Sequence, residues 1–123
     1  MSRKQKRKSP EWQWEQALID AYADKCWHDV LDPLYEKFQR WKVGELGHWD
    51  MDEAIHEVHR QNQRLYGFFD QRREMIVFLI QYQDQEWFTG WVAEHPPPPG
   101  VEVYKPPTYV EVEEAEGEGN KLD

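Results

Sequence analysis

The chain has 123 residues, which suits one domain, and a formal net charge of −9 from 24 acidic and 15 basic side chains. Residues 9–100 carry 17 Asp and Glu against 8 Lys and Arg, so this acidic body disfavours nucleic-acid binding except through the short basic N-terminus. The single cysteine, Cys26, excludes an internal disulfide and a four-thiolate zinc site, and it fits a reducing cytoplasm.

Residues 1–9 are predicted to be a basic disordered arm. Five of its side chains are positive: Arg3, Lys4, Lys6, Arg7 and Lys8. No apolar run follows the arm, and no stretch of the chain approaches the roughly 20 apolar residues that cross a bilayer, so we expect a soluble, cytoplasmic protein. The arm is interpreted either as a solubilising tail or as a weak, salt-sensitive tether to nucleic acid or acidic proteins.

A long first helix is predicted from Pro10 to Lys42. Ser9 is a suitable N-cap, and proline is favoured at the first helical position. Apolar residues then recur roughly every 3.7 positions, at Ile19, Tyr22, Cys26, Val30, Leu34, Phe38 and Trp41. Pro33 interrupts this stripe without changing its phase, which favours a kinked helix over a break near Asp32.

A second long helix is predicted after a turn at residues 43–49. Asp50 and Glu53 form a capping-box pattern, and the helix is expected to run to about Tyr82. Its seam positions step by three and four, as in a coiled coil. They are Ile55, Val58, Asn62, Leu65, Phe69, Arg72, Ile76 and Leu79.

A short third helix is predicted from Asp84, as its N-cap, through Glu94, and the prolines at 96–99 end it. Residues 96–123 read as a proline-rich, acidic and extended tail. The domain organisation is therefore an arm at 1–9, a helical domain at 10–95 and a tail at 96–123.

The predicted fold is all-α: a long antiparallel helical hairpin plus a short third helix, completed as a bundle by dimerisation. Folding at the turn pairs residues whose numbers sum to about 92, which places Arg72 opposite Asp20 and Asn62 opposite Val30. Asn62, Arg72 and Asp20 are the predicted register-setting residues.

More apolar side chains are present than two helices can cover. The additional ones are Trp27, Leu31, Tyr35, Tyr66, Phe68 and Phe78. Uncovered apolar flanks usually mark association sites, so we expect a homodimer or a complex with another protein.

One metal-like motif is present, because Glu53 and His56 have the Glu-x-x-His spacing of di-iron carboxylate bundles and His59 is close by. Such a set suits Fe, Mn or Zn. A di-iron bundle needs two such motifs, however, and Glu53 and His56 fall on the side away from the seam. A solvated polar face without a cofactor is the favoured interpretation.

Aromatic residues are concentrated near the predicted open end of the hairpin. The candidate partner-binding residues are Trp12, Trp14, Tyr82, Trp87, Phe88 and Trp91, with Tyr104 and Tyr109 in the tail. They predict either a packed end-cap or a groove for an extended, proline-bearing peptide.

Catalytic patterns are weak. Cys26 lies in the apolar stripe, where a thiol stays protonated, and His28 faces another way on the helix. No Gly-x-Ser-x-Gly, P-loop or dinucleotide pattern occurs. The leading hypothesis is a non-enzymatic protein–protein interaction protein, an adaptor or accessory subunit. The alternatives are a metal-binding helical bundle and, more weakly, a small nucleic-acid-associated regulator acting through the basic arm.

Overall fold

The computed structural model describes residues 8–103, which form helices and no strand. The helices are α1 (Pro10–Lys42), α2 (His48–Phe69), α3 (Arg73–Gln83) and α4 (Gln85–Glu94). The all-α prediction is therefore confirmed for this part of the chain. Most of the predicted arm and tail lies outside the described residues. The chain divides into two compact units on either side of the Val77–Phe78 bond.

Helix α1 starts and ends where the sequence predicts. The Ser9 side chain accepts a hydrogen bond from the Trp12 backbone N–H at 3.0 Å and so caps the helix. The helix continues through Pro33, so the alternative of a break near Asp32 is wrong. Beyond α1, Gly44 has φ 84°, a left-handed conformation that glycine adopts without strain.

Helix α2 starts earlier than the capping-box pattern predicts. Its N-cap is Gly47, which has no side chain to cap it, so the proposed start at Asp50 with Glu53 is wrong. The Trp41 indole N–H donates to Nδ1 of His48 at 2.9 Å. This bond ties the end of α1 to the first residue of α2 and favours the earlier start.

Helix α2 ends at Phe69, so the prediction of one helix reaching Tyr82 is wrong. Gly67 has a low helix propensity, and the Asp70 carboxylate is unfavourable at the negative end of the helix dipole. Helix α3 starts anew, with its first turn bonded to the carbonyl of Arg72. The predicted seam is consequently divided between two helices, and the phase of its first part does not carry into the second.

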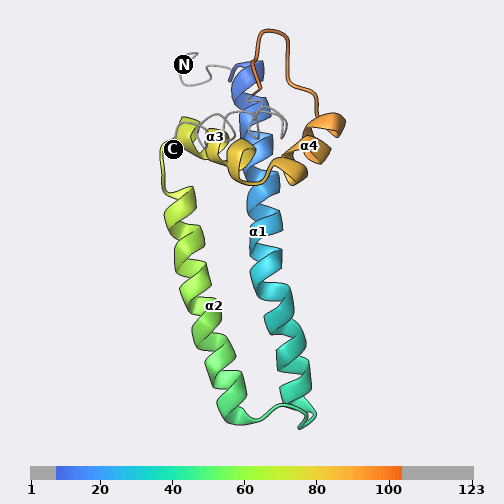
Figure 1. The fold of residues 1–123 in the computed structure, drawn as a ribbon, viewed down its shortest axis with the longest axis vertical. Helices are drawn as coiled ribbons and strands as arrows, with labels where there is room; N and C mark the ends of the chain where they lie inside the picture. Colours follow the sequence, from blue (N-terminus) through green and yellow to red (C-terminus); the bar gives the residue numbers. More distant parts are fainter. Residues whose placement is uncertain (1–7, 104–123) are drawn as a thin grey trace, which may run out of the picture. The chain divides into compact units, whose positions relative to one another are not determined.

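Helices α1 and α2 lie antiparallel and side by side, joined by the short turn (Figure 1). The ring centroids of Tyr22 and Phe68 are 6.0 Å apart, and those of Trp27 and Tyr66 are 6.5 Å apart. These neighbours have residue numbers that sum close to the predicted value. We refer to the two helices as the α1–α2 pair.

Arg73 joins the start of α3 to α1. Its guanidinium donates to the Trp12 carbonyl at 2.9 Å and to the Gln16 side-chain oxygen at 2.8 Å, and it reaches Glu15 at 3.4 Å. The guanidinium carbon also lies 4.2 Å from the centroid of a Trp12 ring. Four groups on α1 therefore hold one side chain of α3.

Arg72 and Asp20 do not form the predicted register-setting pair. The side chain of Arg72 is 86% exposed and pairs with Glu74 at 3.6 Å. Asp20 accepts a hydrogen bond from Gln16 on its own helix. The break after α2 turns the following residues out of the predicted phase, and the neighbouring arginine makes the link.

Buried side chains of the first unit lie toward both ends of the α1–α2 pair. They are Trp14, Leu18 and Tyr22 of α1, Met51 and Ala54 of α2, and Ile76 and Val77 of α3. In the second unit Ile80, Gln81 and Phe88 are buried, and α4 has the predicted bounds with Asp84 as its N-cap residue. None of the helices among residues 8–103 has the length and apolarity needed to span a membrane.

Candidate interaction surface

The second half of α1 exposes a stripe of large apolar side chains. Leu31, Tyr35 and Phe38 are 42%, 63% and 42% exposed. Their spacing of four and three residues puts them on one side of the helix. Trp27, one turn before Leu31, continues the stripe and is half-buried. Phe38 was predicted to lie in the apolar stripe of the first helix, and in the structure its side chain is 42% exposed.

Helix α2 exposes two large apolar side chains on one side. Ile55 and Tyr66 are 41% and 70% exposed, and their separation of eleven residues is about three helical turns, so they share one side. Ile55 was expected in the seam. The edge contact between the rings of Trp27 and Tyr66 places these two side chains and the stripe of α1 on the same side of the α1–α2 pair.

We call this side the apolar face. It consists of Trp27, Leu31, Tyr35, Phe38, Ile55 and Tyr66.

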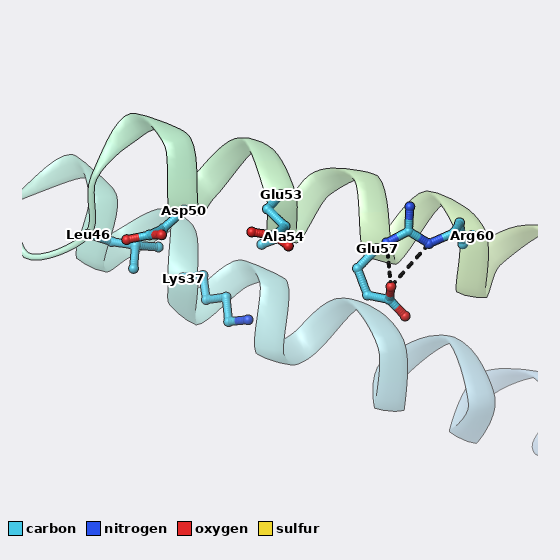
Figure 2. A pocket seen from close by; sticks show the side chains of 7 residues that line it. All are labelled: Lys37, Leu46, Asp50, Glu53, Ala54, Glu57 and Arg60. Carbon is cyan, nitrogen blue, oxygen red and sulfur yellow. Dashed lines mark hydrogen bonds and ion pairs between the residues drawn. The ribbon is translucent and has the colours of Figure 1, made fainter.

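The other side of the α1–α2 pair is charged. A pocket of about 360 Å³ lies there, and its charged lining residues are Lys37, Asp50, Glu53, Glu57 and Arg60 (Figure 2). Glu53 and Glu57 stand two positions before and after Ile55, which turns them about 200° away from it around the helix. We call this side the charged face.

An ion pair orders part of the charged face. The Arg60 guanidinium donates to the Glu57 carboxylate at 2.6 and 3.1 Å, and the Gln61 amide donates to it at 3.1 Å. These donors stabilise the carboxylate and hold the pKa of Glu57 below its usual value, with the Arg60 hydrogen bond contributing most. The charged groups on this face are thus partly satisfied by each other.

Asn62 lies beside the apolar face, four residues before Tyr66 and seven after Ile55. The side chain is half-buried, and its Oδ1 is enclosed without a hydrogen-bond partner in the described structure. Leaving a buried polar atom without a partner costs roughly 1–3 kcal/mol. The asparagine predicted to set register therefore has an oxygen whose bonding capacity is unused.

The candidate metal ligands do not come together. Glu53 lies in the charged pocket, His56 pairs with Asp52 at 3.3 Å, and His59 is exposed. Across residues 8–103, the structure has no group of three His, Cys, Asp or Glu side chains arranged to hold a metal ion. The geometry gives no support to the Fe, Mn or Zn alternative.

The candidate aromatic residues of the first unit lie in two different environments. Trp12 lies between two cations, with Lys8 Nζ 4.7 Å and the Arg73 guanidinium 4.2 Å from its ring centroids. Such cation–π contacts hold the ring at the start of α1. Trp14 is 8% exposed and belongs to the core.

In the second unit the aromatic candidates stack along the helices. Trp87 and Trp91 stack with centroids 6.3 Å apart, and Trp91 stacks on His95 at 4.5 Å. The rings of Tyr82 and Phe78 stack with centroids 5.8 Å apart. Phe88 is buried.

The remaining two candidates, Tyr104 and Tyr109, lie outside the described residues. That the aromatic residues of both ends of the chain meet stays a prediction.

A further electrostatic cluster was missed in the sequence. His28 Nδ1 lies 3.1 Å from the Asp32 carboxylate, and His28 Nε2 lies 3.6 Å from Asp24. The hydrogen bond and charge of Asp32, followed by the charge of Asp24, raise the pKa of His28. The i, i+4 spacing of these three residues was the signal that could have revealed it.

Comparison with protein-family models, curated protein sequences and solved structures gives no match for this chain.

Proposed function

We propose that this protein is a non-enzymatic interaction protein that works as a homodimer, with the apolar face as its interface. The observation that carries the proposal is the contrast between the two sides of the α1–α2 pair. Two helices expose large apolar side chains on one side, whereas carboxylates and basic groups occupy the other. A two-helix layer with one apolar side forms a four-helix bundle when a second layer covers that side.

The size of the face suits a stable dimer. Helix α2 has 22 residues, so at 1.5 Å per residue the layer is roughly 33 Å long. Two adjacent helices are about 20 Å wide, which gives roughly 700 Å² on each copy. A standard specific interface takes about 800 Å² from each partner. The available area is therefore close to what a specific dimer needs.

A second copy also suits the distribution of charge. The chain is acidic overall, which opposes self-association. The charged face, however, points away from the proposed interface, and repulsion between the distant surfaces of two copies is weakened beyond about 8 Å at physiological ionic strength. The interface itself is lined mainly by uncharged side chains, with Asp24 as an exposed carboxylate two turns before Leu31 on the same side of α1. A second copy offers a surface of the same length and character.

Sedimentation of the full chain tests the proposal. We expect wild-type protein at micromolar concentration to sediment at twice the 14.9 kDa chain mass. The double variant Leu31→Glu/Tyr35→Glu should raise the dimer dissociation constant by at least about tenfold, because it buries charge in the interface. The matched control on the charged face, Lys37→Glu/Glu53→Lys, should remain dimeric.

Circular dichroism distinguishes a folded monomeric variant from an unfolded one. If the Leu31→Glu/Tyr35→Glu chain unfolds, the milder Tyr35→Ser exchange on the same face replaces it. A well-folded wild-type monomer would refute the proposal, and so would equal dissociation constants for the variants of the two faces.

A further inference from the structure

We propose that the two copies pair antiparallel, about a two-fold axis that passes near Leu31 and Asn62, and that the Asn62 amides of the two copies bond to each other. This inference rests on the proposed homodimer and specifies its geometry. In a two-fold interface residue i of one copy meets residue j of the other, and j meets i. An antiparallel interface therefore requires a pattern that is symmetric about its own centre.

Helix α1 carries such a pattern about Leu31 at two of the three pairs of positions on this side; the third pair sets Asp24 against the partner's Phe38. Trp27 and Tyr35, both aromatic, stand four residues before and after it. Asp20 and Lys42, of opposite charge, stand eleven residues before and after it. Antiparallel pairing centred on Leu31 thus sets each Trp27 against the partner's Tyr35 and each Asp20 against the partner's Lys42.

Helix α2 shows the same symmetry about Asn62 at one pair of positions. Ile55 and Phe69, both apolar, stand seven residues before and after it.

The two centres lie at the same level of the α1–α2 pair. Neighbours across the pair have residue numbers that sum to roughly 92, as the Trp27–Tyr66 contact illustrates. Asn62 is therefore level with residues 30 and 31. A single two-fold axis can therefore pass through both centres, although the residue patterns of α1 and α2 arise independently.

Asn62 favours the antiparallel arrangement over a parallel one. In a parallel two-fold dimer each α1 covers the other copy's α2, which places the Asn62 amide against the partner's Leu31. In the antiparallel dimer two amides meet, and each can donate to and accept from the other. Because Oδ1 has no partner in the described structure, turning it toward the second copy breaks no hydrogen bond of its own.

Disulfide trapping tests the arrangement on the full chain, with Cys26→Ser as the background. Leu31→Cys should cross-link to itself under mild oxidation, because the antiparallel axis brings the two copies of this position together. Glu36→Cys, exposed on the other side of α1, is the matched control, and we expect it to cross-link at least about tenfold more slowly.

The parallel arrangement is tested with a mixture of Phe38→Cys and Ile55→Cys chains, whose residue numbers sum to 93. A mixed disulfide in this sample, together with no Leu31→Cys dimer, would overturn the antiparallel arrangement. In the Asn62→Val background we expect several-fold slower cross-linking through Leu31→Cys, because the amide pair no longer fixes the register. An unchanged rate would overturn the role assigned to Asn62.

Sedimentation of the same samples separates the two proposals. A dimer that fails to cross-link through Leu31→Cys contradicts the antiparallel geometry and leaves the homodimer standing. A folded monomer contradicts both.

Discussion

The two halves of α1 both carry large apolar residues three or four positions apart, and these residues reach opposite degrees of burial. Trp14, Leu18 and Tyr22 in the first half are 8%, 0% and 8% exposed. In the second half, the stripe of the apolar face is 42–63% exposed at its three outward positions. The helix continues through both halves without a break, so backbone structure does not explain the difference.

The direction in which each half presents its apolar residues explains it. Leu18 and Tyr22 stand thirteen and nine residues before Leu31, which turns them about 140–180° away from it around the helix. The start of α3 is held to the first half of α1 through Arg73, and the large apolar side chains of that half are buried. The stripe of the second half lies on a different side of α1, and its side chains are exposed. Helix α1 thus contributes to a buried core in its first half and leaves large apolar side chains exposed in its second half.

The largest expected effect compares one leucine from each half. Leu18→Ala removes a side chain that is 0% exposed, and we expect it to reduce the free energy of unfolding by about 2–5 kcal/mol. Leu31→Ala should cost about 1 kcal/mol or less in dilute, monomeric protein, because much of that side chain is already in water. Urea denaturation followed by circular dichroism measures both. Equal losses at the two positions would contradict the comparison.

A smaller effect is expected at the link between α3 and the first half of α1. Arg73→Ala removes the contacts with Gln16, Glu15 and the Trp12 carbonyl and the cation–π contact with the Trp12 ring, which together should cost roughly 2 kcal/mol of unfolding free energy. Arg72→Ala, the adjacent control, should cost about 0.5 kcal/mol or less, because its ion pair is exposed. Thermal denaturation of the two variants measures the difference.

Arg73→Lys sharpens this test. Lysine keeps the charge but cannot reproduce the planar fork of donors, so we expect an intermediate loss. If Arg72→Ala were the more damaging variant, the link that secures the first half of α1 would have been assigned to the wrong residue.

Local sequence signals correctly predicted the features that depend on residues close in sequence, such as helix ends. Ser9 and Pro10 gave the start of α1, the apolar phase carried the helix across Pro33, and the bounds of α4 followed from Asp84 and the prolines after it. These features depend on capping, helix propensity and periodicity, which act over a few residues. The all-α class was predictable for the same reason.

The sequence failed where distant contacts outweigh local preference. The unbroken spacing from Ile55 to Leu79 concealed the end of α2 at Phe69, because three-and-four spacing continues across a short break as easily as along a helix. Arg72 was then predicted as the register-setting arginine in place of Arg73, because which of the two faces α1 depends on the helix phase after the break. The exposure of Phe38 and Ile55 was missed because periodicity shows that a helix has an apolar stripe but not how much of that stripe a single neighbouring helix can cover.

The smallest expected effect concerns a charged cluster on the exposed half of α1. His28 is solvent-exposed, and Asp32 and Asp24 raise its pKa above the ordinary value of 6.5. A raised pKa in the folded state means that protonated His28 stabilises the fold. This contribution is fully present below about pH 6.5 and is lost as the pH rises through the folded-state pKa. The stability advantage of wild type over His28→Gln should therefore shrink between about pH 5.5 and pH 8.

Proton NMR of the His28 imidazole tests the cause. The titration midpoint should lie above 6.5 in wild type and fall in Asp32→Asn, with a smaller fall in Asp24→Asn, because Asp32 supplies both the hydrogen bond and the larger charge interaction. A midpoint that does not move in Asp32→Asn would show that this pair does not form in solution. Since these groups lie on a single helix, the result reports on α1 itself.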